Sequence, residues 1–198
     1  RWYKRKFKLR ISDKRKMRME EFKITELLSG RPEQIENEKE KSCYDILDKL
    51  DIEYQRVEYN HFPKDVENLK LIDETLQVEG IKNLIFKTKN KNQFYFIIIQ
   101  RKSRFDEKNF RNKYELPKIS MAKAEDLAEV LNTYAGAVSI MELMNDIENK
   151  IKVFIDENIL KKEYFRFHPN ENKSTVRIKT NDLVNKLMPY LKHEINVL

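Results

Sequence analysis

The first candidates for chemistry are polar side chains that fall where strands begin or turns are expected. Lys82 and Asn83 open a β-rich run, so a cation and an amide would lie at the mouth of a strand. Such a pair can bind an anion or a carbonyl group. The other polar or turn-forming residues in similar contexts are His61, Gly136, Ser139, His168, Pro169, Asn170 and Asn172.

Each of these residues also has an ordinary structural interpretation. His168 can be a loop histidine hydrogen-bonded to the backbone, and Lys82 a solvated lysine at a strand end. Cys43 recurs with Ile46, Leu47 and Leu50 at helical spacing, so we expect it to be a small core residue. Composition and spacing alone predict only a soluble α+β domain.

Several kinds of site are disfavoured by the residue types and their spacing. The three histidines, His61, His168 and His193, are far apart, and no Cys/His or His/Glu spacing matches a zinc site. Three glycines in 198 residues leave no room for a glycine-rich phosphate loop. The nucleophile elbow Gly-x-Ser-x-Gly is absent. We therefore expect neither a metal nor a cofactor.

The charge is unevenly distributed along the chain. Residues 1–18 hold ten Lys or Arg and one acid; subtracting them from the 40 basic and 33 acidic residues leaves 30 and 32, a net of −2. We expect a flexible basic tail over 1–18 and one domain over 19–198. The tail could attract nucleic acid or anionic lipid, or it could be a leader that precedes Met17 or Met19.

No apolar run approaches the roughly 20 residues that a membrane span needs, and the first residues do not resemble a signal peptide. A single cysteine fits a reducing compartment. The expected location is therefore the cytoplasm, without membrane association.

The fold is expected to form around a hairpin of residues 80–87 and 94–99, joined by a polar linker. The second run, Phe94–Ile99, has no polar alternation, so it should be a central strand buried on both faces. The other expected helices lie at about 37–50, 66–76, 106–113, 124–131 and 180–191, and the other strands at 54–59, 119–122, 151–155, 164–167, 175–178 and 195–198. This irregular alternation favours an α+β domain with a mixed sheet.

Five segments, taken in order, resemble the YbaK/prolyl-tRNA-synthetase-associated editing domains, most closely the free-standing prolyl-tRNA deacylases of the ProX or ProXp-ala type. The segments are His61-Phe62-Pro63, Lys82 to Phe86, Gly136 to Ser139 with Leu143 to Asp146, Phe167 to Asn172, and His193-Glu194. The resemblance runs from about residue 40 to the C-terminus.

The chain departs from the family pattern at four places. Ile81 replaces a threonine before the Lys-Asn pair, and Ile140 replaces a proline after Ser139. Phe62 separates His61 from its proline, and Lys192 replaces a glycine. The changes at Ile81 and Ile140 could reshape the amino-acid pocket, so they bear on the substrate more than on the reaction.

The resemblance implies a central mixed, barrel-like sheet flanked by helices and a metal-free trans-editing deacylase acting on mischarged tRNA(Pro), with alanyl-tRNA(Pro) as the expected substrate. Its partners would be the charged 3′ end of tRNA and prolyl-tRNA synthetase. Binding alone discriminates poorly against a smaller amino acid, because a missing methylene is worth only about 1–3 kcal/mol. A second pocket that admits alanine and excludes proline would supply the missing selectivity.

The resemblance also implies roles for individual residues. Lys82 would be the catalytic cation that neutralises the terminal phosphate or the oxyanion, and Asn83 would fix the ester or the ribose. Substrate would further be bound by His61, Gly136, Ser139, His168, Pro169 and Asn172. Two alternatives stay open: a deacylase for cysteine, serine or threonine, and an inactive module that only binds the tRNA end.

Overall fold

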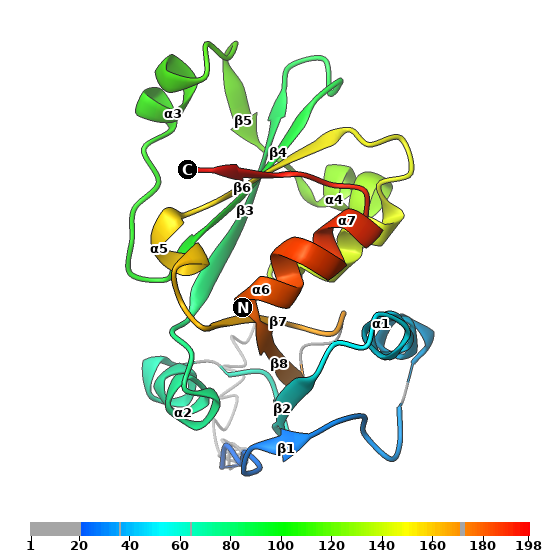
Figure 1. Ribbon diagram of the computed structural model, residues 1–198. Helices are drawn as coiled ribbons and strands as arrows, with labels where there is room; N and C mark the ends of the chain where they lie inside the picture. The colour runs from blue at the N-terminus through cyan, green and yellow to red at the C-terminus, as the bar shows by residue number, and fades with distance from the viewer. Residues whose placement is uncertain (1–20, 36, 64, 171–172) are drawn as a thin grey trace, which may run out of the picture.

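The structure, a computed structural model, describes residues 21–35, 37–63, 65–170 and 173–198 (Figure 1). The predicted basic tail and Asn172 lie outside these residues, so the boundary at residue 18 stays a prediction. The strands of the described part form two sheets, of four and of five strands.

The four-stranded sheet is antiparallel throughout and has the order β1-β2-β8-β7. Its strands are β1 (Leu28–Ser29), β2 (Tyr54–Glu58), β8 (Ser174–Lys179) and β7 (Tyr164–Phe167). The five-stranded sheet is mixed and has the order β5-β3-β4-β6-β9. Its strands are β5 (Ile119–Met121), β3 (Ile81–Thr88), β4 (Phe94–Gln100), β6 (Ile151–Ile155) and β9 (Ile195–Val197).

The predicted hairpin is confirmed as β3 and β4, which pair antiparallel from Ile81 opposite Gln100 to Lys87 opposite Phe94. β4 lies between β3 and β6, and all of its residues except Gln100 are buried. A strand that is covered on both faces needs apolar side chains on both, and this explains its continuous apolar run.

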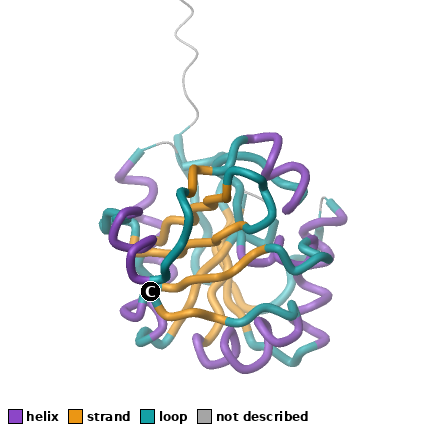
Figure 2. Tube along the Cα trace, turned by 90° about the horizontal axis from the view of Figure 1, so that it is seen from above, coloured by secondary structure: helices purple, strands orange, loops and turns teal. Residues whose placement is uncertain are grey.

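The helices cover the sheets from outside (Figures 1 and 2). They are α1 (Glu38–Lys49), α2 (Val66–Leu76), α3 (Glu107–Lys113), α4 (Ala124–Leu131), the 3₁₀ helix η1 (Ile140–Asn145), α5 (Glu157–Leu160), α6 (Thr180–Asp182), the π-helical turn η2 (Leu183–Leu187) and α7 (Met188–Tyr190). Asn37, Asp65 and Asp106 cap α1, α2 and α3 through their side chains. Such caps satisfy backbone N–H groups that a helix leaves unpaired at its start.

The largest apolar core is shared by both sheets and includes Cys43 of α1, which is fully buried. The complete burial of Cys43 confirms the prediction of a small core residue, and it raises the pKa of the thiol well above its usual range. A second cluster around Phe110 lies on the other face of the five-stranded sheet, under α3. A third, around Ile72 and Leu76, lies between α2 and the four-stranded sheet.

The α+β class with a mixed sheet flanked by helices is confirmed, but neither sheet closes into a barrel. Within the described residues the strand orders are linear, with β1 and β7 at the edges of one sheet and β5 and β9 at the edges of the other. The barrel-like arrangement is therefore corrected to two open sheets that share a core.

The last helix begins at Thr180, where the sequence predicts it. Thr180 to Asp182 form the first residues of the helix, and Lys179 precedes it without a side-chain cap. The middle of this helix is a π-helical turn, and Pro189 follows it. Proline has no N–H to donate, and a wider turn is one way for a helix to accommodate that loss.

No helix of the described residues is long and apolar enough to cross a membrane.

One carboxylate joins α2 to both sheets. Asp73 of α2 accepts two hydrogen bonds from Arg101 after β4, at 2.7 and 2.9 Å, and one from Arg166 of β7 at 2.5 Å. Its Oδ2 also accepts the backbone N–H of Gly80, 3.1 Å away, just before β3. The start of β3 is thereby fixed against β7.

Gly80→Ala should destabilise the fold because a methyl group at this position would overlap the Arg101 guanidinium. Arg101 would have to leave Asp73, and we expect a loss of ~1–3 kcal/mol in the free energy of unfolding. Urea denaturation measures it. In an Arg101→Ala background the same substitution should cost much less, since the obstacle is gone. An equal cost in both backgrounds would contradict this explanation.

Candidate active site

The site begins at Asn83, the third residue of β3. Side chains alternate along a strand, and Ile81 and Ile85 on either side of Asn83 pack into the shared core. The Asn83 amide therefore points toward the core side of the sheet, where its Nδ2 donates to the carbonyl oxygen of Val138 at 2.7 Å. Its Oδ1 is buried, with no hydrogen-bond partner in the described part of the chain.

The Gly136–Ser139 turn is held on both sides. Gly136 has φ = +89°, a conformation that favours glycine. Ser139, fully buried, caps η1: its Oγ accepts the N–H of Met141 at 3.3 Å and donates to the carbonyl oxygen of His168 at 2.6 Å. The turn is thus tied to β3 through Asn83 and to the end of β7 through His168.

His168 follows the last residue of β7, and its ring is held in one tautomer. Nδ1 lies 3.0 Å from the carbonyl oxygen of Ser174, an acceptor, so Nδ1 carries the proton and Nε2 is a hydrogen-bond acceptor. Burial lowers the pKa of His168 to about 4; this outweighs the opposing effect of the Ser174 hydrogen bond, and the charge of Arg166 lowers it further. The ring is therefore neutral at pH 7.

Pro169 is buried beside His168. Asn170 follows it with φ = +59°, and its buried side-chain Oδ1 has no hydrogen-bond partner among the described residues. Two hydrogen bonds, Asn83 to Val138 and Ser139 to His168, connect these three segments, which are far apart in the sequence. The resulting cluster offers neutral donors and acceptors, which can orient a carbonyl group or a water molecule.

Lys82 is not part of this cluster, although it neighbours Asn83. Lys82, Leu84 and Phe86 face the other side of β3, where Leu84 and Phe86 belong to the cluster under α3. Its Nζ donates to the carbonyl oxygen of Ser103 at 2.5 Å. Strand alternation separates the two polar groups that the sequence places next to each other.

The His61 side chain contacts two nearby phenylalanines. Its Nδ1 lies 3.0 Å from the carbonyl oxygen of Phe62, and its ring packs edge-on against Phe22 with 5.4 Å between the ring centroids.

His193 is buried, and both of its ring nitrogens make hydrogen bonds that connect parts of the fold. Nε2 lies 3.0 Å from Oδ2 of Asp146, and Nδ1 lies 2.6 Å from the carbonyl oxygen of Leu191. Burial alone would raise the pKa of Asp146, but hydrogen bonds from His193 and from the N–H groups of Lys150 and Ile151 outweigh it, and the pKa is lowered. This contact fastens the segment before β9 to the end of η1.

We did not predict a role for Glu142 from the sequence. It is 3% exposed, and its Oε2 accepts the N–H of Ser139 at 3.0 Å, which completes a capping box. Burial raises the pKa of Glu142 to about 7, against the opposing hydrogen bonds from Thr133 and Ser139. The Ser-x-x-Glu spacing before an apolar run is the signal that could have found it.

Among the described residues, no group of three or more His, Cys, Asp or Glu side chains is placed to hold a metal ion.

A family model described as an aminoacyl-tRNA editing domain matches residues 65–186, and the chain belongs to this family. It is therefore an aminoacyl-tRNA deacylase, a hydrolase that acts on tRNA. The chain is similar to the prolyl-tRNA editing protein ProX of Acetoanaerobium sticklandii, with 28% identity over 137 residues, 69% of this chain and 83% of the relative.

Two solved structures have a similar fold. One is described as a candidate trans-editing enzyme for prolyl tRNA synthetase, with a TM-score of 0.58 and 14% identity over 83% of this chain and 98% of the other. The second is the hypothetical protein APE2540, with a TM-score of 0.56 and 14% identity over 80% and 97%. At this identity the two structures support the fold alone.

Glu142→Gln should remove a pH dependence of stability. The folded-state pKa of about 7 lies above the ordinary 4.5, so the stabilisation from Glu142 is complete below pH 4.5 and is lost as the pH rises toward 7. At pH 8 the Glu142→Gln variant should be more stable than wild type by up to about 3 kcal/mol, at ~1.4 kcal/mol per pKa unit. At pH 4 the difference should vanish.

Urea denaturation of both proteins across this pH range measures the effect, and other titrating groups cancel in the comparison. Glu142→Ala is the matched control, because it leaves the Ser139 N–H unpaired and should destabilise at every pH. A constant difference between the Glu142→Gln variant and wild type from pH 4 to pH 8 would contradict the raised pKa.

Proposed function

We propose that this protein is a trans-editing deacylase that hydrolyses mischarged tRNA(Pro), and that alanine is the amino acid it removes. The observation that carries the proposal is the hydrogen-bonded cluster of Asn83, the Gly136–Ser139 turn and His168. The similarity to a protein named as a prolyl-tRNA editing protein supports tRNA(Pro) as the substrate. Prolyl-tRNA synthetase, which would release the mischarged product, is the proposed partner.

The proposed reaction is ester hydrolysis without a metal. An aminoacyl ester is already activated, so the enzyme has to place a water molecule and stabilise the developing oxyanion. In this proposal the Asn83 carboxamide binds the ester or the ribose, and the Gly136–Ser139 turn lines the amino-acid pocket. His168 and Pro169 form the opposite wall. A neutral His168 can accept a hydrogen bond at Nε2 from water or a ribose hydroxyl.

In this proposal Lys82 contacts a different part of the substrate from Asn83. Because its side chain lies on the opposite face of β3 from Asn83, a role at the phosphate of the terminal nucleotide fits better than a role at the oxyanion. His61 and Asn172 stay proposed substrate contacts from the resemblance.

A panel of charged tRNAs tests the substrate. We expect wild-type protein to hydrolyse alanyl-tRNA(Pro) at least about tenfold faster than prolyl-tRNA(Pro), because one or two methylenes in a fitted pocket are worth ~10–200-fold. Cysteinyl, seryl and threonyl esters of the same tRNA complete the panel, with Asn83→Ala as the inactive control. If cysteine, serine or threonine is released faster than alanine, that amino acid replaces alanine as the proposed substrate. If no amino acid is released, the result favours a module that only binds the tRNA end.

Lys82→Ala should lower kcat/KM about 10- to 100-fold, the range for one charge-assisted hydrogen bond to a phosphate. If Lys82 binds the phosphate in ground and transition states alike, the loss should be in KM. Lys152→Ala, an exposed lysine of β6, is the control. Steady-state kinetics of the two variants and the wild type measure the effect. An unchanged kcat/KM would show that Lys82 has no role in the mechanism, and a loss in kcat alone would indicate that Lys82 stabilises the oxyanion.

Activity should survive exhaustive dialysis against EDTA, since the proposed chemistry needs only hydrogen-bonding groups of the chain. Initial rates before and after dialysis are the measurement. A loss that a divalent ion restores would refute the metal-free mechanism.

A further inference from the structure

A groove lies on the four-stranded sheet, at the end away from His168. It has a volume of about 650 Å³ and lies between β1, the end of α1, and the ends of β2, β7 and β8. Its lining includes Arg31, Tyr54, Gln55, Tyr164, Arg177 and Lys179. The proposed active site lies at the other end of β7, so this groove is a separate feature.

The groove contains a buried cation that no carboxylate of the described residues neutralises. Three arginines of this sheet are about 5–7% exposed. Arg56 forms an ion pair with Glu58 at 2.8 Å, and Arg166 forms one with Asp73 at 2.5 Å. Arg177, opposite Arg166 in the strand register, has no ion pair with any residue that the structure describes.

The Arg177 guanidinium is held by neutral groups. Two of its nitrogens donate to Oε1 of Gln55, at 2.9 and 2.5 Å, and a third bond goes to the carbonyl oxygen of Leu76. The guanidinium also lies 4.2 Å from the centre of the Tyr164 ring. Buried charges are normally paired, so an anion that enters the groove would find a fixed, uncompensated positive charge.

The rest of the lining adds to this charge. Lys179 is exposed and makes no ion pair within the described ranges. Arg31 is neutralised by Asp45 and Asp48, at 2.7 and 3.0 Å, and Glu53 is the remaining acid of the lining. A partly exposed aromatic ring beside two cations without carboxylate partners is suited to a nucleotide, with its base on the ring and its phosphate on the cations.

We infer that this groove binds the single-stranded 3′ end of tRNA, with a phosphate at Arg177 and Lys179 and a base against Tyr164. The inference rests on the proposed function and extends it to a second contact with the same substrate. From Tyr164 to His168 the chain advances four residues, about 13 Å in an extended strand. That is the length of about four stacked nucleotides at ~3.4 Å each, which matches the unpaired end of a tRNA.

Binding of uncharged tRNA(Pro), intact or lacking its four 3′-terminal nucleotides, tests the inference without using hydrolysis. Lys179→Glu and Tyr164→Leu should each weaken binding of the intact tRNA about tenfold and leave binding of the shortened tRNA unchanged. Lys179→Glu should also reduce the slope of log Kd against log salt by about one. Circular dichroism checks that both variants fold.

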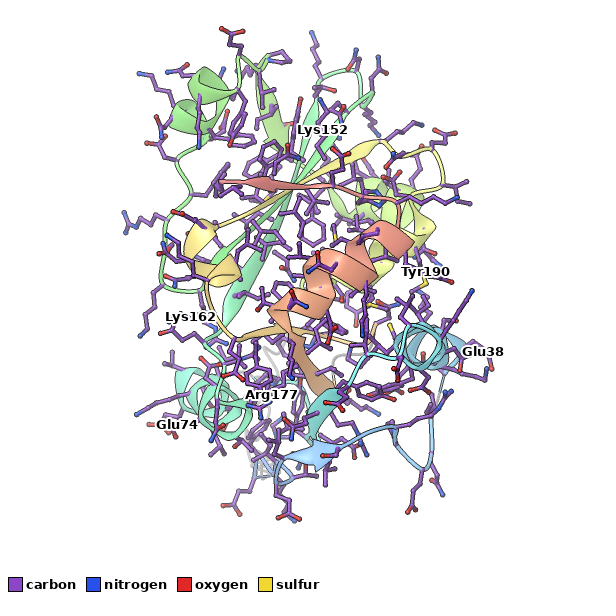
Figure 3. The ribbon with its side chains drawn as sticks, in the orientation of Figure 1. Glu38, Glu74, Lys152, Lys162, Arg177 and Tyr190 are labelled. Carbon is purple, nitrogen blue, oxygen red and sulfur yellow. The ribbon has the colours of Figure 1, made fainter. Side chains whose placement is uncertain are left out.

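Lys152→Glu is the matched control, because Lys152 is an exposed residue of the five-stranded sheet, in the upper half of Figure 3, whereas Arg177 lies on the four-stranded sheet in the lower half. It should bind both tRNAs like wild type. Equal weakening of both tRNAs by the groove variants, or no weakening of either, would overturn the inference. A wild-type protein that binds tRNA as described but releases no amino acid would instead contradict the proposed function and leave the groove standing.

Discussion

The structure depends on the charge cluster at Asp73. This carboxylate accepts hydrogen bonds from Arg101 just after β4, from Arg166 on β7 and from the N–H of Gly80 before β3. It therefore joins α2 to both sheets at one point. Arg166 is 5% exposed, and burial lowers its pKa despite the nearby carboxylate, so removing Asp73 would leave a buried charge without its partner.

From this junction the position of the candidate site follows. The cluster fixes where β3 begins, and the third residue of β3 is Asn83. The alternation of the strand turns Asn83 toward the Gly136–Ser139 turn, and Ser139 then reaches the carbonyl oxygen of His168 on the other sheet. Two hydrogen bonds thus assemble groups that both sheets supply.

The sequence predicted the local elements well because their signals are local. The apolar run of Phe94–Ile99 predicted a strand covered on both faces, and the helix predicted over 124–131 has the bounds that the structure shows, Ala124–Leu131. The opposite orientations of Lys82 and Asn83 also follow from strand alternation, once the strand is known. The Ser139–Glu142 capping box was readable in the same way.

The division into two sheets could not be predicted, because it depends on contacts between distant segments. Nothing near Tyr54 indicates that β2 pairs with β8, and nothing near Asp73 indicates that it binds Arg101 and Arg166. The same holds for Arg177: that no carboxylate among the described residues pairs with it is a property of the folded surroundings.

The most direct test of the proposed site is a titration with an alanyl-adenosine analogue whose ester is replaced by a stable amide, followed by NMR. We expect the analogue to shift the side-chain amide signal of Asn83 and the backbone signals of Gly136 and His168, and to leave Lys152 unchanged. Saturable shifts confined to other parts of the chain would contradict the assignment of the site.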